Sequence, residues 1–124
     1  TTTSTERSRS ALAGEIARVD VVHNLGRVAQ FVAAIEQDDP SMLVGATDDR
    51  LHQAVRLAAV PGASDALDSG LAAGAWCGWL SGSGPTIAFL ADTGVAATVG
   101  GVLPDSGHVK YLRIATQGAH VIAR

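Results

Sequence analysis

The residues of this chain best suited to chemistry lie in a loop of serines and glycines, residues 81–86. An apolar run, residues 76–80, enters the loop, Pro85 closes it, and a second apolar run, residues 86–91, leaves it. Glycine permits the close backbone approach that such a loop needs, and successive N–H groups pointing into one concavity bind anions. The sequence therefore predicts an anion-binding loop between two strands. An ordinary hairpin turn of small residues is the alternative that the spacing leaves open.

Helical periodicity before the loop indicates the elements that must position it. Asp20 is a candidate helix cap, and the apolar residues after it recur at spacings of 4, 3, 4 and 3, which places one apolar stripe on a helix. The stripe consists of Val21, Leu25, Val28, Val32 and Ile35. Pro40 disfavours helix at the residue before it and so ends this helix. A second helix is expected from Ser41 to Leu51, and a third from about residue 64 to Gly74.

The residues after the loop predict the rest of the sheet. A short helix is expected over residues 93–101, a third strand over 109–116 and a final strand over 119–123. Helices followed by a β-β-α-β-β order predict an α+β fold, in which a four-stranded antiparallel sheet carries helices packed on one face.

The composition narrows the class of protein. A length of 124 residues suits one domain with its own core. The chain is 47% hydrophobic but only 17% charged, which suggests that a partner covers part of its apolar surface. The net charge of −3 argues against nucleic-acid binding, because the chain has no basic face to bind phosphates. No apolar segment approaches the ~20 residues of a membrane span, so a cytoplasmic protein without membrane contact is expected.

Several polar residues have a structural reading. Asn24 and Arg27 lie on one side of the first helix and are expected to make buried hydrogen bonds or to pair with Asp48 or Asp49. Those two acidic residues are expected on a solvated face, because neighbours on a helix do not face each other.

The remaining candidates for chemistry are weak. Cys77, the only cysteine, is expected to be a small buried hydrophobe in a reducing compartment. Trp76 and Trp79 are expected in the core or at an interface. The histidines at 23, 108 and 120 have no metal-ligand spacing, so no metal site is predicted.

Four segments, in order, resemble the GHMP kinases, the superfamily of galactokinase, homoserine kinase and mevalonate kinase. The wording Leu-Ser-Gly-Ser-Gly-Pro-Thr at residues 80–86 is similar to the third signature motif of that superfamily. Ser-Thr-Glu-Arg-Ser-Arg at residues 4–9 and Asp-Arg-Leu-His-Gln-Ala-Val-Arg at residues 49–56 resemble segments of its homoserine kinase branch. His-Asn-Leu-Gly-Arg at residues 23–27 looks like the Phe-Asn-x-x-Arg helix of the same branch.

The resemblance covers only the carboxyl-terminal part of that family. It implies a ferredoxin-like C-terminal domain over residues 11–124, preceded by an inter-lobe linker and substrate segment over residues 1–10. The phosphate-binding loop that the family carries in its amino-terminal half has no match here, and the chain begins at Thr1 without an initiator methionine. We therefore interpret the sequence as the carboxyl-terminal portion of such a kinase.

The resemblance also implies the roles of particular residues. Thr5, Arg9 and Arg56 fall where the family binds its substrate, and a small misalignment would exchange Arg9 for Arg7. Arginine suits a carboxylate because its planar fork matches two oxygens. The phosphate-loop support consists of Ser81, Gly82, Ser83, Gly84 and Thr86. No general base is assigned among these segments.

The implied reaction is transfer of the γ-phosphoryl group of ATP to the hydroxyl of homoserine, in threonine biosynthesis. ATP and Mg²⁺ would be bound mainly by the amino-terminal lobe, so the isolated chain is expected to be inactive. The expected partners are homoserine and that lobe, with a homodimer as a further possibility. Two alternatives stay open: another GHMP kinase, such as the cytidyl-methylerythritol enzyme, and a stand-alone ligand-binding or dimerisation domain without catalysis.

Overall fold

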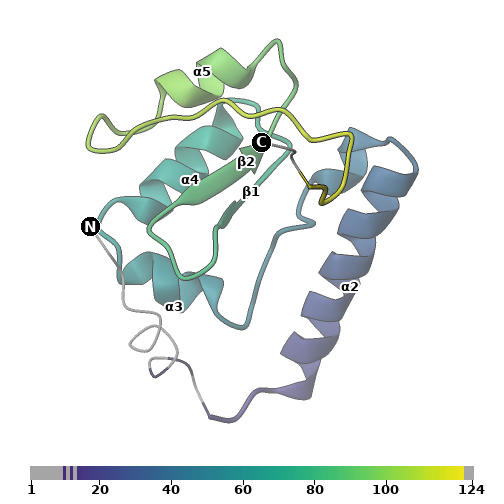
Figure 1. The fold of residues 1–124 in the computed structure, drawn as a ribbon. Coiled ribbons are helices and arrows are strands. Elements are labelled where there is room, and N and C mark those ends of the chain that lie inside the picture. Colours follow the sequence, from purple (N-terminus) through teal and green to yellow (C-terminus); the bar gives the residue numbers. More distant parts are fainter. Residues whose placement is uncertain (1–9, 11, 13, 122–124) are drawn as a thin grey trace.

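The computed structural model describes residues 10, 12 and 14–121. Its elements form an α+β arrangement in which a small sheet is accompanied by helices (Figure 1). In chain order they are α2 (Arg18–Glu36), the 3₁₀ helix η1 (Pro40–Leu43), α3 (Gln53–Ala58), α4 (Ala63–Ala72), β1 (Cys77–Leu80), β2 (Ile87–Leu90) and α5 (Ala96–Gly101).

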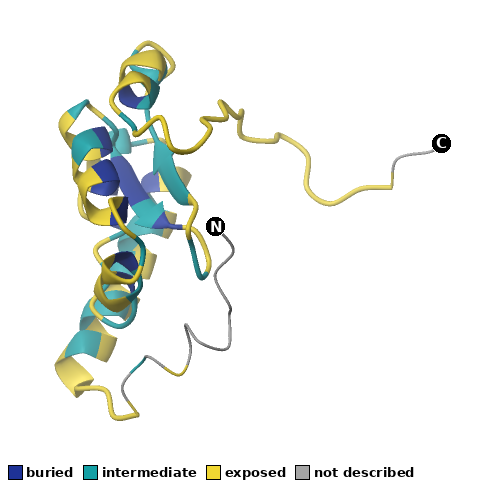
Figure 2. Cartoon of the chain, turned by 90° about the vertical axis from the view of Figure 1, so that its left-hand side faces the viewer, coloured by how far each residue is buried: buried dark blue, intermediate teal, exposed yellow. Residues whose placement is uncertain are grey.

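The two strands form an antiparallel hairpin, with Cys77 opposite Leu90 and Leu80 opposite Ile87. Helices cover one face of this hairpin (Figure 2), and two apolar clusters fill the space between. The first cluster, beneath α3 and α4, comprises Leu57, Ala63, Leu67 and Leu80. The second, beneath α2 and η1, comprises Ala34, Leu43 and Cys77. Cys77 is 1% exposed, and burial raises the pKa of its thiol, so its predicted role as a buried hydrophobe is confirmed.

Two glycines let α4 approach the hairpin closely. A Cβ atom added to Gly70 of α4 would lie 2.4 Å from the ring of Phe89, and one added to Gly78 of β1 would lie 2.6 Å from the same ring. Phe89 on β2 therefore occupies the space that two missing side chains leave, and this packing fixes the position of α4 on the sheet.

The prediction of a four-stranded sheet is wrong for the described residues, because they form a sheet of two strands. Residues 108–121 have no strand geometry and lead away from the body as an exposed segment (Figure 2). The expected strand at 109–116 is thus absent, and the end of the expected strand at 119–123 lies outside the described residues.

Side chains occupy the place where a third strand could pair with β1. In an antiparallel pair, alternate residues point their N–H and C=O groups away from the partner strand. On the outer edge of β1, the Gly78 carbonyl accepts a hydrogen bond from Thr47 Oγ1 at 2.8 Å, and the Leu80 N–H donates to Gln53 Oε1 at 2.9 Å. These two backbone groups are therefore already hydrogen-bonded, and another strand could pair with them only by displacing the two side chains.

The helices before the loop are partly as predicted. The first and third expected helices correspond to α2 and α4, and the short helix after the hairpin corresponds to α5. The second expected helix is wrong. Asp39 Oδ1 accepts from the Ser41 N–H at 3.0 Å and caps η1, and Gly45, at φ +72°, then breaks the helical path. The helix forms later, as α3.

The apolar stripe of α2 is not covered by the described residues. Leu25, Val28 and Val32 are 65%, 63% and 54% exposed, although they occur at the predicted helical spacing. Among the described helices none is long and apolar enough to cross a membrane.

Candidate functional site

The predicted substrate residues fall into two groups. Thr5 and Arg9 lie outside the described residues. Arg56 lies in the last turn of α3, half-buried, and its Nη1 donates a hydrogen bond to the carbonyl of Gly82 at 3.0 Å. The structure therefore brings one predicted substrate arginine directly onto the glycine loop, 26 positions further along the chain.

The loop is a tight reversal with unpaired backbone donors. The Ser81 N–H donates to the Thr86 carbonyl at 2.8 Å, and the Gly84 N–H donates to the Ser81 carbonyl at 3.2 Å. Gly82 and Gly84 have φ values of +61° and +83°, which only glycine adopts readily. Within the described ranges, no backbone carbonyl accepts from the N–H groups of Gly82 and Ser83. Free donors of this kind are what an anion-binding loop requires.

Arg56 also determines how one of these donors is oriented. The bond between Gly82 and Ser83 is a trans peptide, since the cis bond of the loop is the one between Gly84 and Pro85. In a trans peptide the C=O and N–H groups point in opposite directions. With its carbonyl turned toward Arg56, the peptide directs the Ser83 N–H to the other side of the loop.

The amino-terminal end of α3 is held by one carboxylate. Asp49 Oδ1 accepts from the N–H groups of Leu51, His52 and Gln53 at 2.9, 2.7 and 2.9 Å, and Asn24 Nδ2 on α2 donates to Oδ2 at 2.8 Å. Burial by itself would raise the pKa of Asp49, but these hydrogen bonds outweigh burial and hold the pKa below its ordinary value.

Two expectations for this region have different outcomes. The expected pairing of Asn24 with Asp49 is confirmed, and the Asn24 side chain also accepts from the Arg50 N–H at 3.0 Å. The prediction that both acidic residues lie on a solvated face is wrong for Asp49, whose side chain is 15% exposed, whereas that of Asp48 is 56% exposed. The reason is that residues 48 and 49 precede α3 instead of lying on a helix.

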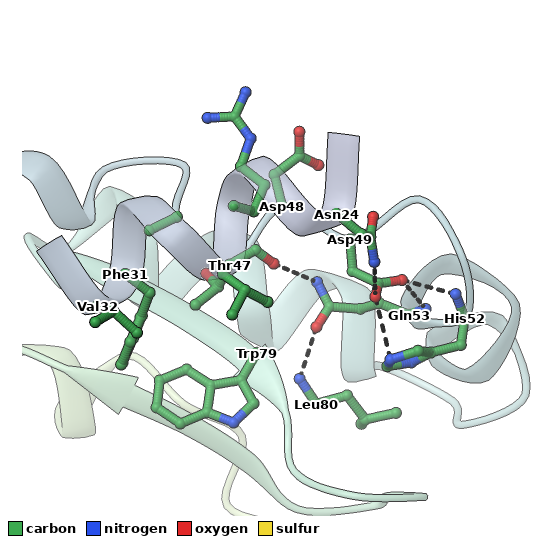
Figure 3. A pocket seen from close by; sticks show the side chains of 13 residues that line it. Asn24, Phe31, Val32, Thr47, Asp48, Asp49, His52, Gln53, Trp79 and Leu80 are labelled. Atoms are coloured by element: carbon green, nitrogen blue, oxygen red, sulfur yellow. Dashed lines mark hydrogen bonds and ion pairs between the residues drawn. The ribbon is translucent and has the colours of Figure 1, made fainter. Parts of the chain in front are cut away.

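A cavity of about 290 Å³ lies between α2 and β1 (Figure 3). Apolar side chains, including Phe31, Val32 and Trp79, line one part of it, and Asn24 and His52 line another. Phe31 and Trp79 meet edge to face, with ring centroids 6.3 Å apart. His52 Nε2 lies 3.1 Å from Asp49 Oδ2, and no group in the described part of the chain pairs with its buried Nδ1.

The sequence did not lead us to expect the capping role of Asp49 or the buried hydrogen bond of Gln53. An acidic residue followed within four positions by a helix is a recognisable capping signal, and it was obscured by the expectation that residues 41–51 form a helix. In residues 10, 12 and 14–121, no group of three or more histidine, cysteine, aspartate or glutamate side chains could hold a metal ion.

A family model described as "GHMP kinases C terminal" matches residues 24–108, which is more than half of the chain. The chain belongs to the GHMP kinases. The matched range contains α2 from residue 24 onward, the Asp49 cap, Arg56 and the glycine loop, so these parts of the site lie within the GHMP kinase C-terminal domain.

Individual relatives carry one name. The homoserine kinase of Desulfitobacterium hafniense is 38% identical over 126 residues, covering 96% of this chain and 42% of that protein. The homoserine kinase of Thermus thermophilus is 39% identical over 95 residues, covering 77% and 32%. The crystal structure of homoserine kinase from Cytophaga hutchinsonii matches with a TM-score of 0.76 at 29% identity, covering 82% of this chain and 33% of that one. The chain thus spans well under half the length of these relatives.

Proposed function

We propose that this GHMP kinase domain is the carboxyl-terminal part of a homoserine kinase, which transfers the γ-phosphoryl group of ATP to the homoserine hydroxyl in threonine biosynthesis. The observation that carries the proposal is the hydrogen bond from Arg56 to the glycine loop at Gly82. This bond supports the proposal because it joins a guanidinium group, which suits a carboxylate, to a loop with free N–H donors. Homoserine bears a carboxylate at one end and the reacting hydroxyl at the other.

In this proposal Arg56 and Arg9 bind the carboxylate of homoserine, and the hydroxyl of Thr5 donates to the substrate or orients its hydroxyl. The guanidinium group has donors to spare: its Nε is buried and has no partner among the described residues. An arriving carboxylate would satisfy donors that are costly to leave unpaired. Binding the substrate at its acid end fixes the position of its hydroxyl, and phosphoryl transfer depends chiefly on such positioning.

The glycine loop supports the phosphoryl-transfer site. The N–H groups of Gly82 and Ser83 would stabilise charge on phosphoryl oxygens or hold the nucleotide loop of the amino-terminal lobe. Mg²⁺, which offsets phosphate charge when it is bound, would be held with ATP mainly by that lobe, since the described residues offer no cluster of metal ligands. This division explains why the domain alone is expected to be inactive.

The alternatives are not favoured. The cytidyl-methylerythritol kinase reading has no use for a carboxylate-binding arginine, because its substrate lacks an amino-acid carboxylate. A stand-alone sensor or dimerisation domain does not account for relatives that are named kinases and are more than twice as long as the matched segment. A cytoplasmic location and a homodimer remain part of the proposal.

The test joins residues 1–124 to the amino-terminal portion of the Desulfitobacterium hafniense relative and measures homoserine-dependent ADP release. We expect activity in the joined protein and none from residues 1–124 alone. Arg56→Gln should raise the KM for homoserine by about 10- to 100-fold, because a charged hydrogen bond contributes about 1.5–3 kcal/mol. The control is Arg50→Gln, which removes the same charge from an exposed side chain whose nearest carboxylate, on Asp20, is 4.0 Å away. An equal KM in both variants would contradict the proposal.

A further inference from the structure

We infer that Gln53 is a positioning residue for the substrate site, which holds the glycine loop and Arg56 in one fixed arrangement. The inference rests on the proposed function only for the role of Arg56. Among the described residues, Gln53 is the one buried polar residue, at 9% exposure. A buried amide is costly unless its hydrogen bonds are made, so its partners indicate why it is there.

The partners of Gln53 belong to the loop support. Its Oε1 accepts from the N–H of Leu80, the last residue of β1, at 2.9 Å, and its Nε2 is 3.5 Å from the Thr47 carbonyl. Figure 3 shows the amide lying between these two groups. Leu80 is the residue at which the chain leaves the strand and enters the loop, so Gln53 fixes the position from which the loop starts.

Gln53 and Arg56 act on the same loop from the same helix. They are three residues apart on α3 and therefore lie on one face of it. Gln53 binds the N–H of Leu80, and Arg56 binds the carbonyl of Gly82, two residues further along. These two contacts, together called the α3 clamp here, prevent α3 and the loop from moving independently.

The α3 clamp has its own anchor. Asp49 Oδ1 accepts from the backbone N–H of Gln53 and of His52, so the first turn of α3 is fixed before its side chains reach the loop. With only six residues, α3 is too short to be stable without such support. The clamp thus determines the orientation of Arg56 toward substrate and of the Ser83 N–H toward the opposite side.

The first test uses amide hydrogen exchange and NMR of residues 1–124. Gln53→Met keeps the size of the side chain and removes both hydrogen bonds. We expect the Leu80 amide to exchange at least about tenfold faster, and the Arg56 Nε–Hε signal to shift. Gln53→Glu retains an acceptor for the Leu80 N–H and should restore both readings.

Gln30→Met is the matched control. Gln30 on α2 donates to the backbone carbonyls of Met42 at 2.7 Å and Val44 at 3.0 Å, and it accepts from Arg27 Nη1 at 2.7 Å. All three partners are far from the loop in the chain. Gln30→Met should reduce stability without a selective change at Leu80 or Arg56. If Gln53→Met changes the Leu80 exchange rate and the Arg56 Nε–Hε signal no more than Gln30→Met does, the inference is wrong.

The second test measures kinetics in the joined protein. We expect Gln53→Met to raise the KM for homoserine about tenfold and to leave the KM for ATP within about twofold, with Gln53→Glu restoring the homoserine value. A merely structural role would not separate the two substrates. Faster exchange at Leu80 with an unchanged homoserine KM would overturn the inference and leave the kinase function standing. If the joined protein shows no homoserine-dependent ADP release, the proposed function is wrong. The exchange results would still decide whether the α3 clamp exists.

Discussion

At the scale of single residues, Asp49 illustrates how one side chain can connect several parts of a site. Its carboxylate caps α3 and is joined to α2 through Asn24, so it links two helices that are distant in sequence. The hydrogen bonds that it accepts stabilise its charged form, which is why its pKa lies below the ordinary value despite burial. A lowered pKa makes folding sensitive to acid.

Replacing Asp49 should therefore reduce stability in a pH-dependent way. Asp49→Ala removes the cap and should cost about 1–2 kcal/mol in the free energy of unfolding at neutral pH. Asp49→Asn keeps a capping oxygen but no charge. Because the native pKa is depressed, the stability due to the charge is complete above the ordinary value of 3.8 and is lost as the pH falls through the native pKa.

Urea unfolding at a series of pH values checks this prediction. The difference in unfolding free energy between the unaltered chain and Asp49→Asn should be constant from neutral pH down to about pH 5 and should shrink in stronger acid. Asp48→Asn serves as the control, because the Asp48 side chain is largely exposed and surface pairs contribute little. A difference that did not change with pH would show that the charge of Asp49 is unimportant.

At the scale of elements, the contact between α4 and the hairpin depends on absent side chains. The ring of Phe89 fills the space above Gly70 and Gly78. Alanine normally favours a helix over glycine by about 1 kcal/mol. At Gly70, however, the new Cβ would overlap a ring held in the core, and overpacking costs about 1–3 kcal/mol.

Gly70→Ala should consequently lower the unfolding temperature. The matched control is Gly26→Ala on α2, where a Cβ would meet nothing within 4 Å and the full helical gain of about 1 kcal/mol should appear. The double change Gly70→Ala with Phe89→Leu should recover part of the loss, because it removes the overlapping ring atoms. Stabilisation by Gly70→Ala alone would mean that α4 does not pack against Phe89 in this way.

At the scale of the whole molecule, large apolar side chains are exposed along two segments of the described chain. The stripe on α2 is exposed, and so is much of the segment after α5, where Leu112 and Ile114 are 86% and 77% exposed. A large exposed apolar patch marks an interaction surface. The low content of charged residues agrees with this interpretation, since such a surface carries few charges.

Polar substitutions on the α2 stripe should accordingly be tolerated. Leu25→Gln and Val32→Gln should each change the unfolding free energy of residues 1–124 by less than about 0.5 kcal/mol, whereas Leu67→Gln, at a site 7% exposed, should cost more than about 2 kcal/mol. Chemical denaturation followed by circular dichroism measures all three. Comparable losses at Leu25 and Leu67 would show that other parts of the chain cover the stripe.

Local sequence patterns predicted those helices and strands whose formation depends on their own residues. The spacing of apolar residues predicted α2, and two apolar runs around small residues predicted the β1–β2 hairpin. The first helix ends in the predicted region, but at Glu36, because Asp38 at φ +49° leaves the helical path before Pro40 is reached. The family resemblance implied that Arg56 and the glycine loop serve the same reaction, and the hydrogen bond from Arg56 to Gly82 joins them.

Other features could not be read from the sequence because they depend on contacts between distant segments. The sequence predicted a helix through Asp49, but Gly45 breaks the helical path before that residue. The role of Gln53 depends on its hydrogen bond to the outer edge of β1, which the sequence does not reveal. The residues after α5 have a strand-like sequence, but a strand requires a partner strand, and the described residues after α5 pair with none.

The amino-acid sequence by itself thus determined the family, the periodic helices and the glycine loop, because each of these is encoded over a few neighbouring residues. Only the tertiary structure decided that α3 exists, that it holds the loop through Gln53 and Arg56, and that the sheet has two strands in the described chain. Hydrogen bonds between segments 26 or 27 residues apart join α3 to the loop, and no local pattern specifies such partners.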